Sequence, residues 1–310
     1  QGTNTPYKAS KEKPELLFYG DFDGSGNKRI VEAKFEGKTC YPRRGFSCSS
    51  GAMPALRNRL KTFENFARST LGDLYGDVLS GSLRLEANTL ESCILLNNGN
   101  ARFNVTKLPR AAQFSPSQGV LLSDLDGDGL TDCVLAQNFF GAQPEIGLLD
   151  SGLSVFLHGR GSGRFLAAGP DTSGIRVAGA ATALTTADLN LDGRPELAFA
   201  VNDSPVMFFS ELPVSNQSHK LFEVRLRGKP GNLVSVGARI TLSSLTTSQS
   251  QTSEITAGSG YLGQSEAARW FGLGPAAPET PISVTVRWPD GSSTTTRTVA
   301  GDGKVLIPQP

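Results

Sequence analysis

The sequence predicts an all-β protein in which a partial β-propeller with a helical insertion precedes a C-terminal β-sandwich-like domain. Short apolar or β-branched runs alternate with Gly, Asn, Asp and Pro along most of the chain, and an acidic loop recurs between such runs. Beyond residue 211 the composition shifts toward Thr- and Ser-rich strands. We therefore expect propeller blades in residues 1–215 and a second β domain in residues 216–310.

Strands are expected wherever turn residues bound an apolar run, as at 119–123, 132–136, 153–157, 196–201, 205–209, 239–244 and 282–288. In the last of these runs Val284, Val286 and Trp288 alternate with polar residues, which indicates a sheet with one face in water. Residues 211–218 have the composition of a linker, so we place the domain boundary at 212–220.

One segment has a helical period instead. Between Pro54 and Gly76 apolar residues recur every three or four positions, while charged residues lie off this stripe. The stripe consists of Leu56, Leu60, Phe63, Ala67, Leu71 and Leu74. We expect one helix, or two short ones, over about residues 54–76, packed beside the β core as an insertion without a function of its own.

The composition excludes several functions. The chain has 310 residues, and 30 Lys and Arg against 29 Asp and Glu give a formal net charge of +1. This balance gives no electrostatic reason to bind nucleic acid or an anionic membrane. No apolar run approaches the ~18 residues that span a bilayer. We expect a soluble chain without membrane insertion, long enough for about two domains.

The first residue and the cysteines give information on processing of the chain and on the redox compartment in which it folds. Because the sequence begins with Gln1 rather than Met, we interpret it as a processed or recombinant chain from which any leader has been removed. Cys40 and Cys48 are close enough to staple one loop, and Cys93 and Cys133 both lie in strand-like stretches. We favour disulfide bonds in an oxidising compartment, with four buried thiols as the alternative.

The clearest chemical signal is the acidic loop that starts at Asp124. Carboxylates occupy its positions 1, 3, 5 and 9, which are Asp124, Asp126, Asp128 and Asp132, and Leu130 at position 7 offers a backbone carbonyl. Ca²⁺ binds six to eight oxygens, and crowded carboxylates repel one another unless a cation neutralises them. We predict a Ca²⁺ site. Mg²⁺ fits less well because it keeps its waters, and an acidic turn without metal is the alternative.

Two further copies depart from this pattern. The second copy offers oxygens at the same positions, from Asp188, Asn190, Asp192, Arg194 (its backbone carbonyl) and Glu196. The third copy offers Asp21, Asp23, Ser25 and Asn27. Its ninth position is Arg29, so we expect a degraded site in which Glu32 compensates or a turn that binds nothing. The sequence thus predicts two to three Ca²⁺ ions.

A second repeated element supports a blade period. Residues 95–103 and 156–165 both read as a strand, a Gly-containing turn and a Phe. The acidic loops at 124 and 188 start 64 residues apart, the length of a four-stranded propeller blade. Three blades cannot close a ring. We favour missing blades on another chain over an arc packed on a partner or degenerate blades within residues 1–20 and 34–110.

These residues resemble a known family. The acidic loops and the turn repeats are similar to the FG-GAP/VCBS repeats of integrin-α-type propellers. Stretches 233–242, 258–265, 270–274 and 284–292 are similar to the ASPIC/UnbV domain. Their combination resembles cartilage-acidic-protein-like proteins. The resemblance implies Ca²⁺ bound in the loops and a secreted, cell-surface or periplasmic location, and it supplies no catalytic residue.

The function we expect is binding rather than catalysis. His158 in a Gly-rich turn and His219 in a linker are the only histidines, and we expect both at the surface. We expect a Ca²⁺-binding extracellular or surface protein that mediates protein–protein or adhesion-type interaction. The alternatives are a structural subunit of a surface assembly or filament and a glycan-binding module, and a hydrolase is least favoured.

Two further groups of residues are candidates for contacts with a ligand or for modification. Trp270, Trp288 and Tyr261 are candidate contact aromatics, although we expect core packing instead. Three segments match the N-glycosylation pattern, beginning at Asn104, Asn202 and Asn216.

Overall fold

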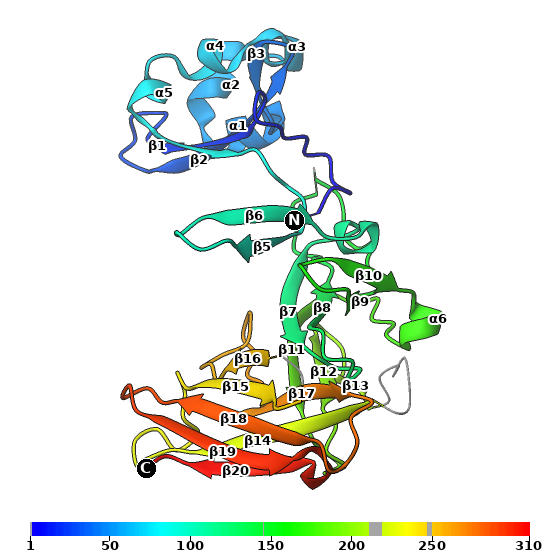
Figure 1. Ribbon diagram of the computed structural model, residues 1–310. Coiled ribbons are helices and arrows are strands. Elements are labelled where there is room, and N and C mark those ends of the chain that lie inside the picture. Colours follow the sequence, from blue (N-terminus) through cyan, green and yellow to red (C-terminus); the bar gives the residue numbers. More distant parts are fainter. Residues whose placement is uncertain (1, 145, 211–218, 247–249) are drawn as a thin grey trace. The chain divides into compact units, whose positions relative to one another are not determined.

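The computed structural model describes residues 2–144, 146–210, 219–246 and 250–310, and it is an all-β protein with a small helical part (Figure 1). The chain divides into two compact units. One comprises residues 5–91 and 143–147, and the other comprises the N-terminal residues up to Asn4 with residues 92–142 and 148–310. The predicted fold class is confirmed, although the described residues contain no closed ring of blades.

The smaller unit is a four-stranded sheet covered on one face by helices. Its strands, in the order β3-β2-β1-β4, are β3 (Thr39–Pro42), β2 (Arg29–Glu36), β1 (Glu15–Gly20) and β4 (Leu83–Ala87). Alternation along β1 and β2 turns Leu16, Phe18, Val31 and Ala33 into the core beneath the helices. The first acidic loop connects β1 to β2.

The helical insertion consists of five short helices rather than one or two. They are α1 (Phe46–Ala52), α2 (Pro54–Leu60), α3 (Phe63–Arg68), α4 (Leu71–Tyr75) and α5 (Val78–Gly81). The chain breaks where Thr62 caps α3 and where Thr70 forms a capping box with Asp73. These breaks rotate the stripe, so that Phe63 is 67% exposed instead of buried.

The larger unit contains two blades. The first has the order β10-β9-β8-β7, from β7 (Ser117–Ser123), β8 (Asp132–Gln137), β9 (Val155–Gly159) and β10 (Phe165–Ala168). The second has the order β11-β12-β13, from β11 (Ala181–Ala187), β12 (Glu196–Val201) and β13 (Met207–Phe209). A shared core that includes Val134, Phe156, Leu184 and Phe199 holds them together. In both blades the acidic loop connects the first two strands.

The predicted turn repeat is also present. β5 (Cys93–Asn97) and β6 (Phe103–Lys107) form a two-stranded hairpin. In its turn the Asn98 amide donates to the Arg102 carbonyl at 3.0 Å, and in the β9–β10 turn the Arg160 amide donates to the Arg164 carbonyl at 2.8 Å. The two segments therefore adopt the same five-residue turn, as their shared sequence pattern suggested.

The C-terminal part is a sandwich of two sheets. One has the order β17-β14-β20, from β14 (Lys220–Arg227), β17 (Ala268–Gly274) and β20 (Lys304–Pro308). The other has the order β16-β15-β18-β19, from β15 (Arg239–Ser244), β16 (Ser250–Glu254), β18 (Pro281–Arg287) and β19 (Ser293–Val299). Val284, Val286 and Trp288 all lie in the core between the sheets, as their alternation predicted.

The remaining expectations have mixed outcomes. Among the described residues the expected disulfide bonds are not formed, and Cys40 and Cys133 are thiols. Trp270 and Trp288 are buried, whereas Tyr261 is exposed. Asn104 and Asn202 are exposed; Asn216 and the predicted linker 211–218 lie outside the described residues. None of the described helices has the length and apolar character needed to cross a membrane.

Candidate metal centre

The acidic loop 124–132 is organised by its own backbone amides. Asp124 at position 1 accepts hydrogen bonds from the amides of Gly127 at 2.8 Å and Gly129 at 2.7 Å. Asp126 accepts from the Asp128 amide at 3.1 Å. Gly127 and Gly129 have φ values of 78° and 91°, a region that favours glycine. The glycines at positions 4 and 6 therefore let the chain curl around the first carboxylate.

The ninth residue closes the loop onto the neighbouring strand. Asp132 begins β8, and its carboxylate accepts hydrogen bonds from the Leu125 amide at 2.9 Å and from the Gly159 amide at 2.8 Å. Gly159 ends β9, the next strand of the blade. Asp132 therefore ties both ends of the loop to the sheet.

The carboxylates of this loop converge in a buried place. Asp124, Asp126 and Asp132 are buried, and carboxylate oxygens of Asp124, Asp126 and Asp128 lie within 4.8 Å of one another. Burial raises the pKa of Asp124 to about 7 and that of Asp132 to about 6, and it also raises the pKa of Asp128. Several converging carboxylate oxygens fit a hard divalent cation such as Ca²⁺.

The structure adds a histidine that sequence reasoning assigned to the surface. His158 lies in β9, its side chain is 15% exposed, and its Nδ1 atom lies 3.2 Å from Oδ2 of Asp126. A hydrogen bond to Asp126 raises the pKa of His158. Asp126, Asp132 and His158 together form a second cluster of potential ligands. Only the pairing of β8 with β9 places His158 beside the loop, so motif spacing within the loop did not reveal it.

The loop 188–196 repeats the same turn. Asp188 accepts hydrogen bonds from the amides of Asp192 at 3.1 Å and Gly193 at 3.0 Å. The ninth residue, Glu196, accepts from the Leu189 amide at 2.7 Å, as Asp132 does from Leu125. Glu196 is buried, and among the described residues its Oε1 atom has no hydrogen-bond partner. A buried carboxylate oxygen without a hydrogen-bond partner fits a bound cation.

The other predicted ligands of this loop lie near solvent. Asn190 and Asp192 are exposed and joined by a hydrogen bond of 3.0 Å, and the Arg194 amide donates to Asp192 at 2.8 Å. The loop therefore has a buried half, made by Asp188 and Glu196, and an exposed half.

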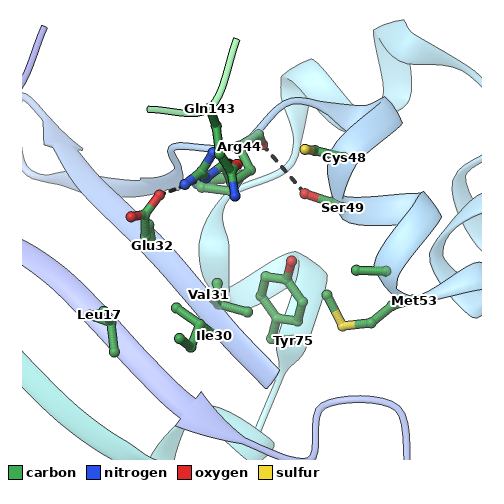
Figure 2. Close-up of a pocket in the computed structure, with 12 residues that line it drawn as sticks. Leu17, Ile30, Val31, Glu32, Arg44, Cys48, Ser49, Met53, Tyr75 and Gln143 are labelled. Atoms are coloured by element: carbon green, nitrogen blue, oxygen red, sulfur yellow. Dashed lines mark hydrogen bonds and ion pairs between the residues drawn. The ribbon is translucent and has the colours of Figure 1, made fainter. Parts of the chain in front are cut away.

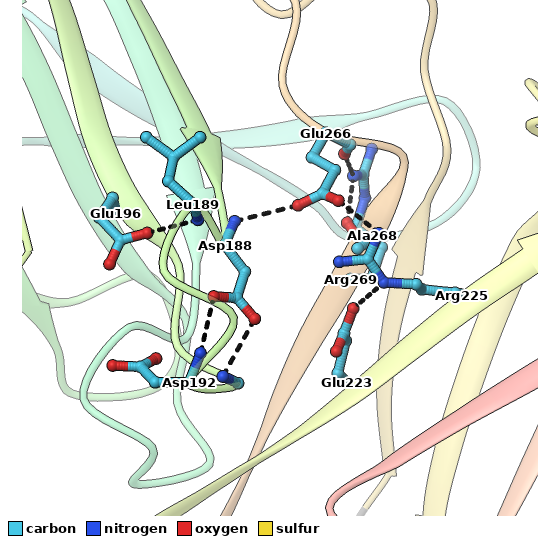
Figure 3. A network of polar contacts seen from close by, with 10 residues as sticks. Asp188, Leu189, Asp192, Glu196, Glu223, Arg225, Glu266, Ala268 and Arg269 are labelled. Atoms are coloured by element: carbon cyan, nitrogen blue, oxygen red, sulfur yellow. Dashed lines mark hydrogen bonds and ion pairs between the residues drawn. The ribbon is translucent and has the colours of Figure 1, made fainter.

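The C-terminal sandwich contacts both loops, through β17 at one and through the segment before β17 at the other. The Asp188 amide donates to Glu266 at 3.0 Å, and Glu266 is paired with Arg225 of β14 (Figure 3). At the loop 124–132 a Cβ added to Gly272 of β17 would lie 1.9 Å from Oδ2 of Asp124. Only glycine allows β17 to approach the acidic loop so closely. The sandwich thus helps to bury the carboxylates.

The loop 21–29 has the same turn in more open surroundings. Asp21 accepts hydrogen bonds from the amides of Ser25 at 3.2 Å and Gly26 at 2.7 Å, and Asp23 accepts from Ser25 at 3.2 Å. The described side chains of this loop are half-buried or exposed. The side chains of Ser25 and Asn27 hydrogen-bond to each other at 3.4 Å.

Glu32 pairs with an arginine outside the loop 21–29. Its carboxylate accepts a hydrogen bond of 2.6 Å from Nε of Arg44, at the rim of a cavity of about 300 Å³ that Val31, Met53 and Tyr75 also line (Figure 2). The structure therefore does not bring Glu32 to the loop 21–29, where the sequence suggested that it compensates for Arg29.

The blades and the loops define a class of protein with propeller-type repeats, in which an Asp-rich turn joins the first two strands of each blade. Family comparisons agree with this class. Residues 124–199 match an FG-GAP-like repeat, and residues 228–310 match the ASPIC and UnbV domain. The chain thus combines an FG-GAP-like repeat with a C-terminal ASPIC/UnbV domain, which confirms the resemblance seen in the sequence. A search of curated proteins found no match.

Proposed function

We propose that this chain is a non-catalytic Ca²⁺-binding protein of the cell surface or extracellular space that acts by binding another protein. One observation carries the proposal: Asp124, Asp126 and Asp132 are buried together in a loop that offers no equal positive charge. FG-GAP repeats are typical of extracellular or surface proteins, and neither family match names a catalytic domain.

The ions would stabilise the contact between the two buried loops and the C-terminal sandwich rather than take part in a reaction. Both buried loops touch strands or loops of the sandwich, through Gly272 at Asp124 and through Glu266 at Asp188. A cation that neutralises the carboxylates would remove their mutual repulsion and fix the loop conformations. The blades would then present a rigid surface to a partner.

An open apolar face in the smaller unit supports a protein partner. On the face of the sheet opposite the helices, the strand register aligns Tyr19 with Ile30 and with Leu83, and Leu17 with Leu85. Tyr19, Ile30, Leu83 and Leu85 are all exposed. Contiguous exposed apolar side chains mark interaction sites, and another blade is the kind of surface that covers such a face in a propeller.

The metal proposal is tested by thermal unfolding of the full chain with Ca²⁺ and with a chelator. A site filled at 100 times its Kd adds about 2.7 kcal/mol to stability, so we expect a clear rise in Tm with Ca²⁺. Asp126→Ala should remove much of this rise. Asp171→Ala, which alters an almost fully exposed carboxylate, should keep it. Equal melting of the unaltered chain with and without chelator would refute Ca²⁺ binding.

The partner proposal is tested by the mass of the native particle. We expect light scattering on material from the native source to show an assembly larger than one chain, and Leu85→Asp to dissociate it. A lone monomer in native material would count against a partner chain, whatever the outcome of the metal experiment.

A further inference from the structure

The ninth position of the loop 21–29 holds an arginine whose side chain turns back onto the loop. Arg29 begins β2, and its Nε atom lies 3.7 Å from Oδ2 of Asp23, the third residue of the loop. This Nε atom is buried, and within the described residues it has no hydrogen-bond partner. Its contact with the loop is therefore electrostatic, with a guanidinium held beside a loop carboxylate.

The three loops differ in charge at positions 1, 3, 5 and 9. The loop 124–132 has four carboxylates there, for a charge of −4, and the loop 188–196 has three, for −3. In the loop 21–29 two carboxylates and one guanidinium give −2 + 1 = −1. The arginine of the loop 188–196 has another task, because Nη2 of Arg194 donates to the carbonyl of His219 at 3.2 Å.

The other oxygen atoms that could bind a metal ion in the loop 21–29 already have other partners. The Ser25 hydroxyl accepts hydrogen bonds from the Asn27 amide at 3.3 Å and from its side-chain nitrogen at 3.4 Å. Glu32 is paired with Arg44. A divalent ion would find two carboxylates and a fixed positive charge, which disfavours its binding.

We propose that the Arg29 guanidinium takes the place of the metal ion in the loop 21–29, so that this loop folds without metal and the chain binds two Ca²⁺ ions rather than three. The inference rests on the proposed function, since it assigns ions to the other two loops. The amide hydrogen bonds to Asp21 match those to Asp124 and Asp188, so the turn itself is already complete.

Native mass spectrometry of the full chain with added Ca²⁺ measures the ion count directly. We expect two ions on the unaltered chain and three on Arg29→Asp, because the variant restores a carboxylate at the position of Asp132. Lys28→Asp is the matched control. It makes the same change of charge at an exposed neighbouring residue, and it should leave the count at two.

Three ions on the unaltered chain would overturn the inference, and so would two ions on a folded Arg29→Asp chain. If Arg29→Asp fails to fold by circular dichroism, Asp23→Asn decides: a count that stays at two supports the inference, and a fall to one overturns it. No ion on the unaltered chain would refute the proposed function. If the unaltered chain binds no ion but Arg29→Asp binds one, the proposed role of Arg29 is supported even though the proposed function is refuted.

Discussion

The acidic loops 124–132 and 21–29 share one turn but not one environment. In both, the position 6 glycine donates to the position 1 aspartate at 2.7 Å, from Gly129 to Asp124 and from Gly26 to Asp21. The spacing of Asp and Gly is therefore enough to form the turn. The residues that form the turn are therefore distinct from the residues that set the charge and burial of its carboxylates.

Position 9 and the covering strands make the difference. In the loop 124–132 position 9 is Asp132, which is 1% exposed, and Gly272 of the sandwich closes over Asp124. In the loop 21–29 position 9 is Arg29, and the surroundings are more open. We therefore propose that the crowded, buried carboxylates of the first loop favour a bound cation, whereas the Arg29 guanidinium lies beside the fewer carboxylates of the second.

We expect the largest loss of stability when the residue at position 9 of the loop 124–132 is changed to the arginine found in the loop 21–29. Asp132→Arg would place a long cation in a buried position and remove the acceptor for the amides of Leu125 and Gly159. We expect it to cost about 3 kcal/mol or more of unfolding free energy, measured by urea titration in the presence of Ca²⁺. The variant should also bind one ion fewer.

Asp132→Asn separates the two effects. Its side-chain oxygen still accepts one of the amide hydrogen bonds, so in chelator Asp132→Asn should lower the unfolding free energy less than Asp132→Arg does. With Ca²⁺ present, Asp132→Asn should lower the unfolding free energy more than it does in chelator. Wild-type stability for Asp132→Arg would show that position 9 is not a structural part of the loop.

The next largest effect is expected in the pH dependence of the unfolding free energy of the metal-free chain. Burial raises the pKa of Asp124 to about 7, above its ordinary 3.8, so between these values the folded chain holds a proton that the unfolded chain has released. Stability in chelator should therefore fall as the pH rises, by about 2 kcal/mol between about pH 5.5 and about pH 8. Urea titrations at several pH values would measure this fall.

The two loops should behave differently in that experiment. Asp124→Asn should make the fall smaller, because it removes the carboxyl group whose pKa is raised to about 7. Asp132, with a pKa of about 6, and His158 should retain part of the fall. Hydrogen bonds from Ser25 lower the pKa of Asp23, so its contribution is complete above the ordinary pKa and does not change in this range. Asp23→Asn should leave the slope intact, and a flat profile for the unaltered chain would contradict the buried charge at Asp124.

Much of this candidate site was predictable from spacing, because the acidic residues of each loop are close together in sequence. The carboxylates of Asp124 and Asp132 both lie in the loop and accept hydrogen bonds from its amides, while their role as Ca²⁺ ligands stays a prediction. β12 begins at Glu196 as expected. Neighbouring strands contribute what spacing could not show. His158 reaches Asp126 only through strand pairing, and Gly272 reaches Asp124 from 148 residues away in sequence.

The sequence prediction for the helical insertion was wrong for local reasons. Apolar periodicity between Pro54 and Gly76 predicted one helix or two short ones, but the cap at Thr62 and the capping box at Thr70 divide the segment further. Threonine at these places favours helix starts over helix interiors, and periodicity does not register it. Glu32 has suitable spacing from the loop 21–29 but finds Arg44 instead, a pairing that depends on the folded course of the chain after β3.

The smallest expected effect concerns Glu32. Because its carboxylate pairs with Arg44 rather than with the loop 21–29, Glu32→Gln should lower the unfolding free energy by only about 0.5–1 kcal/mol and leave the ion count unchanged. Arg44→Gln should have an effect at least as large, since it breaks the same partly exposed pair and also removes the hydrogen bond from Arg44 to Gln143. A lost ion in Glu32→Gln, with none lost in Arg44→Gln, would mean that Glu32 serves the loop after all. The contrast between the loops would then lie in where the last ligand comes from rather than in Arg29.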